Sequence, residues 1–243
     1  MKFIIASFIA LFFFGAIANA EISLDVSTSA YCGDAGGCGT GVLSWSHTNS
    51  GNLLVVCSAT EDTVAAADTP VTGITYNSIA LTKVDAQAWG SGTESVELWY
   101  LLNPATGSNT VSITYTGVSF AQVGIASSYY RVAQSNQTDA NNKAQGSATT
   151  DISVTVTTVN ENSWVVDCAM DQASSHTIAV AGGDQTQLQN LTAGGSLRAG
   201  SSYLSNKSPA GSAVMNWTSS ANATFGTVAA SFHPFRKVKI TSD

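Results

Sequence analysis

Short runs in which apolar and polar residues alternate recur along the whole chain, and helical periodicity is almost absent. Runs of this length between turn residues are typical of an all-β fold, and we expect an antiparallel β-sandwich of jelly-roll or immunoglobulin-like type. In the first half the predicted strands are Ile22–Val26, Val42–His47, Leu53–Ala59, Val71–Tyr76, Ile79–Val84, Val96–Leu102, Thr110–Thr116 and Ala121–Tyr130. In the second half they are Ile152–Thr157, Trp164–Ala169, Thr177–Val180, Gln185–Leu191, Leu197–Leu204, Ala213–Thr218 and Phe225–Phe232.

Two turns between these runs have a recognisable chemistry. Asn77-Ser78 separates two apolar runs, and Asn tolerates the positive φ that a tight hairpin requires. In Pro104-Ala105-Thr106-Gly107, proline presets φ and glycine closes the turn. Both stretches therefore predict hairpins.

Two short stretches of the sequence resemble each other. Leu53–Cys57 (LLVVC) aligns without gaps on Trp164–Cys168 (WVVDC), and Ile113–Thr116 aligns on Met215–Thr218. A polar stretch, Gln134–Thr150, lies between and is interpreted as a linker. We predict two duplicated halves, residues 41–131 and 151–233; chance similarity between β patterns is the alternative. Each half alone would expose an apolar sheet face, so we expect the halves to pack as one domain, 41–235.

The first twenty residues have the pattern of a secretory signal peptide. One lysine precedes an uncharged apolar core, and Ala18-Asn19-Ala20 ends the segment as an A-x-A cleavage site. A membrane anchor is the alternative, but the run is slightly short and lacks stop-transfer charges. We expect a secreted, extracellular or cell-surface protein that begins at Glu21, with no membrane span after cleavage. An N-terminal strand and cysteine loop, 21–40, would precede the sandwich.

The charge balance argues against nucleic acid as a partner. The formal net charge is −7, charged residues make up 10% of the chain, and 44% of it is hydrophobic. Phosphate binding needs clustered Lys and Arg. The one basic cluster, Arg236–Lys239, lies in a short tail, 236–243, and is too small to change this expectation.

From Val42 to Phe232 the chain resembles a β-sandwich module of secreted bacterial and environmental surface proteins, for which no function is established. The stretches that carry the resemblance are Ser44–Thr48, Asn52–Val56, Ile74–Val84 and, most specifically, Val96–Gly117 (VELWYLLNPATGSNTVSITYTG). The module is similar in general character to jelly-roll and immunoglobulin-like domains. The resemblance implies no catalytic residue. Both cysteine pairs depart from its pattern.

Four cysteines in an exported chain permit three disulfide connectivities. Cys32 and Cys38 flank a glycine-rich loop that closes easily, and we expect them to be joined. Cys57 and Cys168 occupy matching positions in the repeated strands. They are either bonded, if those strands are neighbours, or two free buried cysteines.

Candidate chemistry elsewhere is sparse. The three histidines, His47, His176 and His233, are far apart in the sequence, and no G-x-S-x-G motif accompanies them. Gly36–Gly39 matches only a fragment of a calcium-binding nonapeptide repeat. Acidic residues end the two repeated strands, namely Glu61, Asp62, Asp167 and Asp171. Solvated loop acids are the expectation there, with Ca²⁺ binding as the alternative, and we predict no catalytic residue and no other cofactor or metal.

Two further features concern the surface. Trp89 lies in a small-residue loop, where an exposed ring could stack on a sugar, although loop tryptophans more often tuck onto the domain. Candidate N-glycosylation sites are Asn136, Asn190, Asn206, Asn216 and Asn222.

These observations favour a non-enzymatic protein that acts by interaction, adhesion or assembly, with a protein or glycan partner at a cell surface. A carbohydrate-binding, lectin-like module is the first alternative. A filament subunit that donates Ile22–Val26 to the sheet of a neighbour is the second, and a hydrolase with an unfamiliar site is the third.

Overall fold

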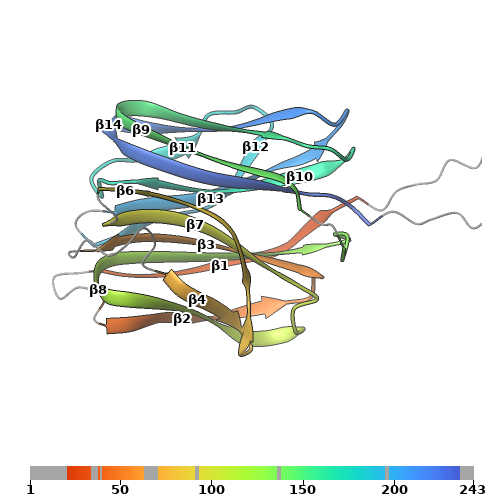
Figure 1. The fold of residues 1–243 in the computed structure, drawn as a ribbon, viewed down its shortest axis with the longest axis horizontal. Helices are drawn as coiled ribbons and strands as arrows, with labels where there is room; N and C mark the ends of the chain where they lie inside the picture. The colour runs from red at the N-terminus through yellow and green to blue at the C-terminus, as the bar shows by residue number, and fades with distance from the viewer. Residues whose placement is uncertain are drawn as a thin grey trace, which may run out of the picture.

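A computed structural model describes residues 21–33, 38, 40–62, 71–90, 93–135, 138–194 and 197–235. In this part of the chain fourteen β-strands form two antiparallel sheets that pack on each other (Figure 1). The predicted all-β antiparallel sandwich is confirmed. The predicted signal peptide and the basic tail, 236–243, lie outside the described residues.

The first sheet contains eight strands. They are β1 (Ser23–Cys32), β2 (Thr40–Asn49), β3 (Leu53–Asp62), β4 (Val71–Tyr76), β5 (Ile79–Ala80), β6 (Thr82–Trp89), β7 (Glu94–Leu102) and β8 (Gly107–Tyr130). The order is β5-β4-β8-β3-β7-β6, with β1 and β2 also paired to β8.

The second sheet contains six strands. They are β9 (Thr138–Thr157), β10 (Ser163–Asp171), β11 (Ile178–Val180), β12 (Gln185–Ala193), β13 (Leu197–Lys207) and β14 (Ser212–Phe232). The order is β11-β14-β10-β13-β12, with β9 paired to β14.

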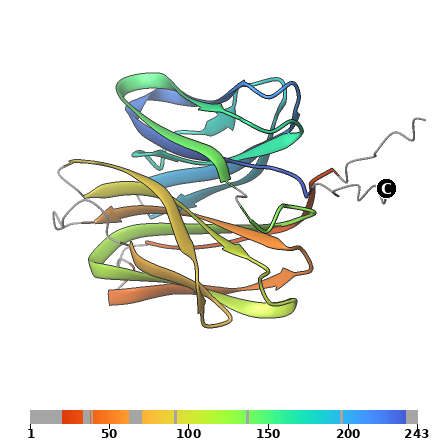
Figure 2. The same ribbon diagram turned by 45° about the vertical axis from the view of Figure 1, so that its right-hand side comes forward.

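Each sheet is divided into an inner and an outer layer by one long strand. The first part of β8 pairs with β2 and β4, whereas its second part pairs with β1 and β3. In the second sheet, β14 pairs through its first part with the end of β9 and with β11, and through its second part with β10. Four layers are therefore stacked on one another, as Figures 1 and 2 show.

Successive side chains of β3 and β10 point to opposite faces of the sheet, and both faces of each strand are covered by a core. Leu54 and Val56 point into the core between the two layers of the first sheet. Val55 and Cys57 point the other way, into the core between the two sheets, where they meet residues of β10 such as Val166. Burial of both faces makes LLVVC a continuous apolar run rather than an alternating one, and in WVVDC only Asp167 interrupts the run.

The two sheets share a pairing order. The sequence β4-β8-β3-β7-β6 in the first corresponds to β11-β14-β10-β13-β12 in the second. The duplication of the chain itself stays a prediction.

Several predicted boundaries are wrong. The stretch predicted as a linker, Gln134–Thr150, contributes most of β9, and the runs predicted as separate strands on either side of Gly117 are one strand, β8. Likewise Ala213–Thr218 and Phe225–Phe232 belong to β14, which continues through a register shift after Thr218. One of the two predicted hairpins is present: β4 and β5 pair across Asn77 and Ser78, which both have positive φ. The other prediction is wrong. The chain does turn before Gly107, which begins β8 with a φ of 88°, but β7 and β8 do not pair, because β3 lies between them.

Candidate functional site at the seam between the sheets

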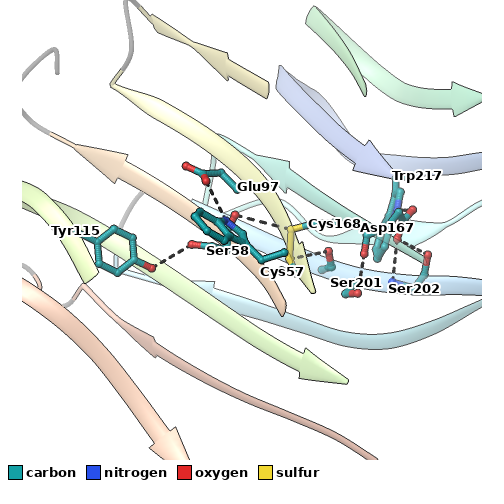
Figure 3. The surroundings of a disulfide bond; sticks show 11 residues. Cys57, Ser58, Glu97, Tyr115, Asp167, Cys168, Ser201, Ser202 and Trp217 are labelled. Atoms are coloured by element: carbon teal, nitrogen blue, oxygen red, sulfur yellow. Dashed lines mark hydrogen bonds between the residues drawn. A yellow bond between two sulfur atoms is a disulfide. The ribbon is translucent and has the colours of Figure 1, made fainter. Parts of the chain in front are cut away.

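A disulfide joins the two sheets within the core between them (Figure 3). Cys57 on β3 and Cys168 on β10 are bonded, with 5.3 Å between their Cα atoms, and they are 111 positions apart in the sequence. Both side chains are buried. A second disulfide joins Cys32 to Cys38, the local pairing expected from the sequence, with a Cα–Cα distance of 5.2 Å. Disulfides of this kind are typical of extracellular proteins.

Asp167, one residue before Cys168, is the centre of a buried hydrogen-bond network. Its Oδ1 accepts bonds from the main-chain N–H of Ser202 at 2.9 Å and from the Ser202 hydroxyl at 2.6 Å. Its Oδ2 accepts from the indole Nε1 of Trp217 at 2.7 Å and from Nε2 of Gln185 at 3.2 Å. Burial raises the pKa of the Asp167 carboxyl to about 7, although the bonds from Ser202 and Trp217 act in the opposite direction.

A second buried carboxylate lies in the first sheet, on β7. Glu97 accepts a hydrogen bond from Nε1 of Trp99 at 3.0 Å and forms an ion pair with Lys83 at 2.9 Å. The Lys83 ammonium also lies 4.9 Å from the centre of the Trp99 ring, a cation–π arrangement. Burial raises the pKa of Glu97, and the Lys83 partner opposes this. Each sheet thus contains one buried acid that accepts an indole N–H.

Trp89 is tucked onto the domain, as is more common for such tryptophans, and its ring is not free to stack on a sugar; only its predicted place in a loop is wrong. Trp89 is the last residue of β6, its side chain is only 7% exposed, and it belongs to the core between the sheets. Its Nε1 donates to Oε1 of Gln172 at 3.4 Å, and Gln172 in turn donates to Oε1 of Glu94 at 2.5 Å. Gly226 on β14 lies so close to the ring that a Cβ there would be 2.4 Å from it. The ring therefore fills a space that β14 leaves open.

Two of the acids predicted to lie in solvated loops are fully buried. Asp167 and Asp171 both lie within β10 and are 0% exposed. Asp171 Oδ2 accepts bonds from the Ser219 hydroxyl at 2.5 Å and from Nδ1 of His176 at 3.0 Å. Among the described residues no three His, Cys, Asp or Glu side chains are grouped so that they could hold a metal ion.

Asp171, His176 and Ser219 together bring an acid, an imidazole and a hydroxyl into contact. In a Ser-His-Asp triad the serine bonds to one ring nitrogen and the acid to the other. Here Ser219 and Asp171 both contact Nδ1 of His176, and Ser219 donates directly to Asp171. The arrangement does not let the imidazole take a proton from Ser219 while the acid holds its other nitrogen.

The remaining histidines have different surroundings. His47 is buried and bonds to the Thr28 hydroxyl through Nδ1 at 2.8 Å and to the Ser128 hydroxyl through Nε2 at 3.3 Å. Burial lowers its pKa to about 4, so the ring is neutral at physiological pH. His233 contacts the carbonyl of Pro234 at 3.2 Å. The structure brings no two of the three histidines together at a shared site.

The outward face of β2, β8 and β4 is a regular array of hydroxyl groups. Cross-strand pairs place serines and threonines side by side, such as Ser44 with Ser112, Ser46 with Thr110 and Thr48 with Ser108. This hydroxyl face consists of Ser44, Ser46, Thr48, Thr75, Ser108, Thr110, Ser112 and Thr114. None of these side chains is buried, and none is charged. Sequence reasoning missed the hydroxyl face, although the alternation of Ser and Thr along Val42–Thr48 and Ser108–Thr114 was the available signal.

The candidate glycosylation sites differ in exposure. Asn206 and Asn222 are exposed, whereas Asn190 and Asn216 are half-buried. The side-chain amide of Asn190 donates to the Ile178 carbonyl at 2.5 Å, so a glycan there would replace a bond between β12 and β11. Asn136 lies outside the described residues.

Comparison with known proteins adds no assignment, because no family model and no curated protein matches this chain. The described part of the chain contains no helix that is long and apolar enough to cross a bilayer.

Proposed function

We propose that the protein is an exported, non-enzymatic interaction module that works at a cell surface or in the extracellular medium. The observation that carries this proposal is the Cys57–Cys168 disulfide, which joins the two sheets within the core between them. Disulfides form and persist in oxidising compartments and are rare in the cytosol. This bond also links β3 of the first sheet covalently to β10 of the second, which restricts movement of one sheet against the other.

Three further features support the proposal. The first twenty residues have the pattern of a secretory leader. The strand β1, which contains most of the segment considered for donation to a neighbour, pairs with β8 of its own chain. Both carboxylate oxygens of the buried Asp167 accept hydrogen bonds from donors of the fold itself, as in a structural network. These features favour a rigid binding scaffold over both a strand-donating filament subunit and a hydrolase.

The test is the location and redox state of the full chain in its own host. An epitope tag after Phe235 would follow the protein through fractionation of cells, cell surface and medium. We expect the tagged protein at the surface or in the medium, with its N-terminus at Glu21 and without free thiols after alkylation under denaturing conditions. Protein that stays inside cells with reduced Cys57 and Cys168 would overturn the proposal.

A second candidate function, binding of a neutral carbohydrate, is favoured by the hydroxyl face rather than by Trp89. An uncharged row of hydroxyl donors and acceptors matches an uncharged polyol better than an ionic ligand. The test compares the mature protein with the Thr110→Lys/Thr114→Lys variant on a glycan array. Binding of a neutral glycan that the variant loses supports this function, and equal binding by both proteins places the glycan elsewhere. No binding by either argues against the function itself.

A further inference from the structure

We propose that β2 is a self-association edge through which two copies of this chain pair antiparallel, so that their outer layers form one continuous sheet. An exposed strand edge carries unpaired main-chain groups, and proteins normally protect such edges with charges, short strands or covering segments. Several other edges among the described residues have such protection. This assignment deepens the proposed interaction function by naming a second copy as the partner.

The edge of β6 is capped by side chains from β9. Lys143 donates to the main-chain carbonyl of Ala86 at 2.8 Å and forms an ion pair with Asp85 at 2.9 Å. Asn141 also bonds to Asp85, at 3.0 Å, and Gln145 accepts a bond from Gln87 at 3.3 Å. A strand from another molecule could pair with β6 only by displacing these contacts.

Main-chain groups in the C-terminal half of β9 bond to side chains of the same strand. The side chain of Asn142 donates to the carbonyl of Thr155 at 2.9 Å, and the Thr149 hydroxyl bonds to both main-chain groups of Asp151. The edges formed by β5 and β11 are only two and three residues long. The strands β1 and β12 contact each other across the two sheets, with a side-chain hydrogen bond from Ser29 to Gln189 at 3.5 Å.

The strand β2 has none of these protections in the part of the chain that the structure describes. It is ten residues long, pairs only with β8, and contains no Lys, Arg, Asp, Glu or Pro. Val42 on its outward face is 57% exposed. A long edge without charges is the kind that pairs readily with another strand.

The direction of the unpaired groups follows from the hydrogen bonds of the neighbouring strand. The carbonyl of Thr110 on β8 accepts a bond from the N–H of Asn77, after β4, so the main chain of Thr110 faces away from β2. Thr110 is opposite Ser46 in the β2–β8 ladder. In such a non-hydrogen-bonded pair both residues point their main-chain groups outward. The N–H and C=O of Ser46, and by alternation those of Ser44 and Thr48, therefore lie on the free side of β2.

We infer that the partner strand is β2 of a second copy of this chain. A two-fold axis beside β2 places β2 antiparallel to itself, and an uncharged edge meets an uncharged edge without repulsion. A continuous sheet in the order β5-β4-β8-β2-β2′-β8′-β4′-β5′ results. Such closure uses the open edge of each copy once, so the assembly ends at two chains.

The test uses the mature, oxidised protein and measures its mass by light scattering during size-exclusion chromatography over a range of concentrations. We expect a dimer that dissociates on dilution. Ser46→Pro removes an N–H that points outward and leaves the β2–β8 ladder intact, so it should weaken the dimer by at least about tenfold. The Thr110→Lys variant is the matched control, because it alters the same face on an inner strand and should remain dimeric.

A second variant keeps the test decisive if Ser46→Pro fails to fold. Ser44→Lys/Ser46→Lys brings like charges together across the two-fold axis and should also be monomeric, while circular dichroism and thermal melting report an intact fold. A wild-type protein that stays monomeric at millimolar concentration would overturn the proposal. So would dimers that persist in both β2 variants, or open-ended species instead of dimers. None of these outcomes depends on where the host places the protein, so this test and that of the proposed function can fail separately.

Discussion

At the scale of single residues, the structure differs from the sequence-based prediction mainly in the burial of side chains predicted to lie in surface loops, such as Trp89, Asp167 and Asp171. Trp89 follows an alternating strand and precedes Gly-Ser-Gly, so its local sequence resembles an exposed loop. Its burial depends on Gly226, which lies 137 positions later and opens a space for the ring. Nothing in the local sequence of either residue specifies that contact.

The contact between Trp89 and Gly226 predicts a coupled pair of mutations. Trp89→Ala should lower the free energy of unfolding by about 3–5 kcal/mol, because it leaves a cavity in the core between the sheets. Gly226→Ala should cost about 1–3 kcal/mol in the wild type, since its methyl group overlaps the indole ring. In the Trp89→Ala background the same methyl group has room, so its cost should largely disappear. Urea unfolding of the four proteins measures the coupling, and strict additivity would contradict it.

The buried acid Asp167 predicts a pH-dependent stability. The pKa of an aspartate in an unfolded chain is about 3.9, whereas burial raises that of folded Asp167 to about 7. Between these values the folded protein holds a proton that the unfolded chain has lost, so the free energy of unfolding falls as pH rises through this window. The Asp167→Asn variant does not titrate there and should show a smaller fall.

The measurement is the urea midpoint of unfolding at about pH 5 and about pH 8, either side of the upper end of the window. Glu94 and Glu97, whose pKa values burial also raises, contribute equally to both proteins and cancel in the comparison. Asp184→Asn, at an exposed position, serves as the control. The same pH dependence in wild type and Asp167→Asn would show that Asp167 is not protonated in the folded state.

At the scale of strands, the position of most elements follows from alternation and turn chemistry, but their length does not. Val71–Tyr76 is predicted with the bounds that the structure has, because a turn residue ends the run on its C-terminal side. By contrast β8 crosses Gly117, and β14 crosses a polar stretch around Asn222, because each is paired on both sides of the interruption. Pairing partners far away in the sequence decide whether a polar interruption ends a strand.

The polar half of β9 is the clearest example. The residues Thr138–Gly146 lack an apolar alternation and are therefore predicted as a linker, yet they pair with Phe225–Phe232 of β14. Asn141, Lys143 and Gln145 use their polar side chains to reach β6. Alternation of apolar and polar residues marks strands with one buried face. It does not reveal the first half of β9, whose polar side chains bond to the edge strand β6.

The contacts of Lys143 with the edge of β6 should affect association of the protein more than its stability. Lys143→Ala removes the bond to the Ala86 carbonyl and an exposed ion pair, which should change the free energy of unfolding by less than about 1 kcal/mol. The uncovered β6 edge should nevertheless promote concentration-dependent association beyond that of the wild type. Light scattering measures this, with Lys207→Ala at the end of an inner strand as the control. Unchanged association in Lys143→Ala would show that the cap is dispensable.

At the scale of the whole molecule, the Cys57–Cys168 disulfide connects the two sheets. The sequence places the two cysteines in matching strands but leaves open whether they are bonded, because the packing of one half on the other is not encoded locally. The hydrogen-bonded partners of the neighbouring Asp167 come from β12, β13 and β14. Their convergence likewise depends on the complete second sheet.

The two disulfides should differ in their contribution to stability. A cross-link stabilises more when it closes a longer loop, which gives about 5 kcal/mol for a separation of 111 residues and about 2 kcal/mol for a separation of six. The Cys57→Ala/Cys168→Ala variant should therefore lose more stability than Cys32→Ala/Cys38→Ala. Urea unfolding under non-reducing conditions compares the two. A larger loss from the Cys32–Cys38 variant would contradict this order.

The division of β8 and β14 between two layers has a consequence for a chain that emerges N-terminus first. All partners of β8 precede it in sequence, so the first sheet is complete once Tyr130 is available. The second sheet lacks its organising strand until β14 arrives, because β9, β10 and β11 all pair with it. We therefore expect the first sheet to form before the second, and the Cys57–Cys168 bond to close only once β10 packs on the first sheet.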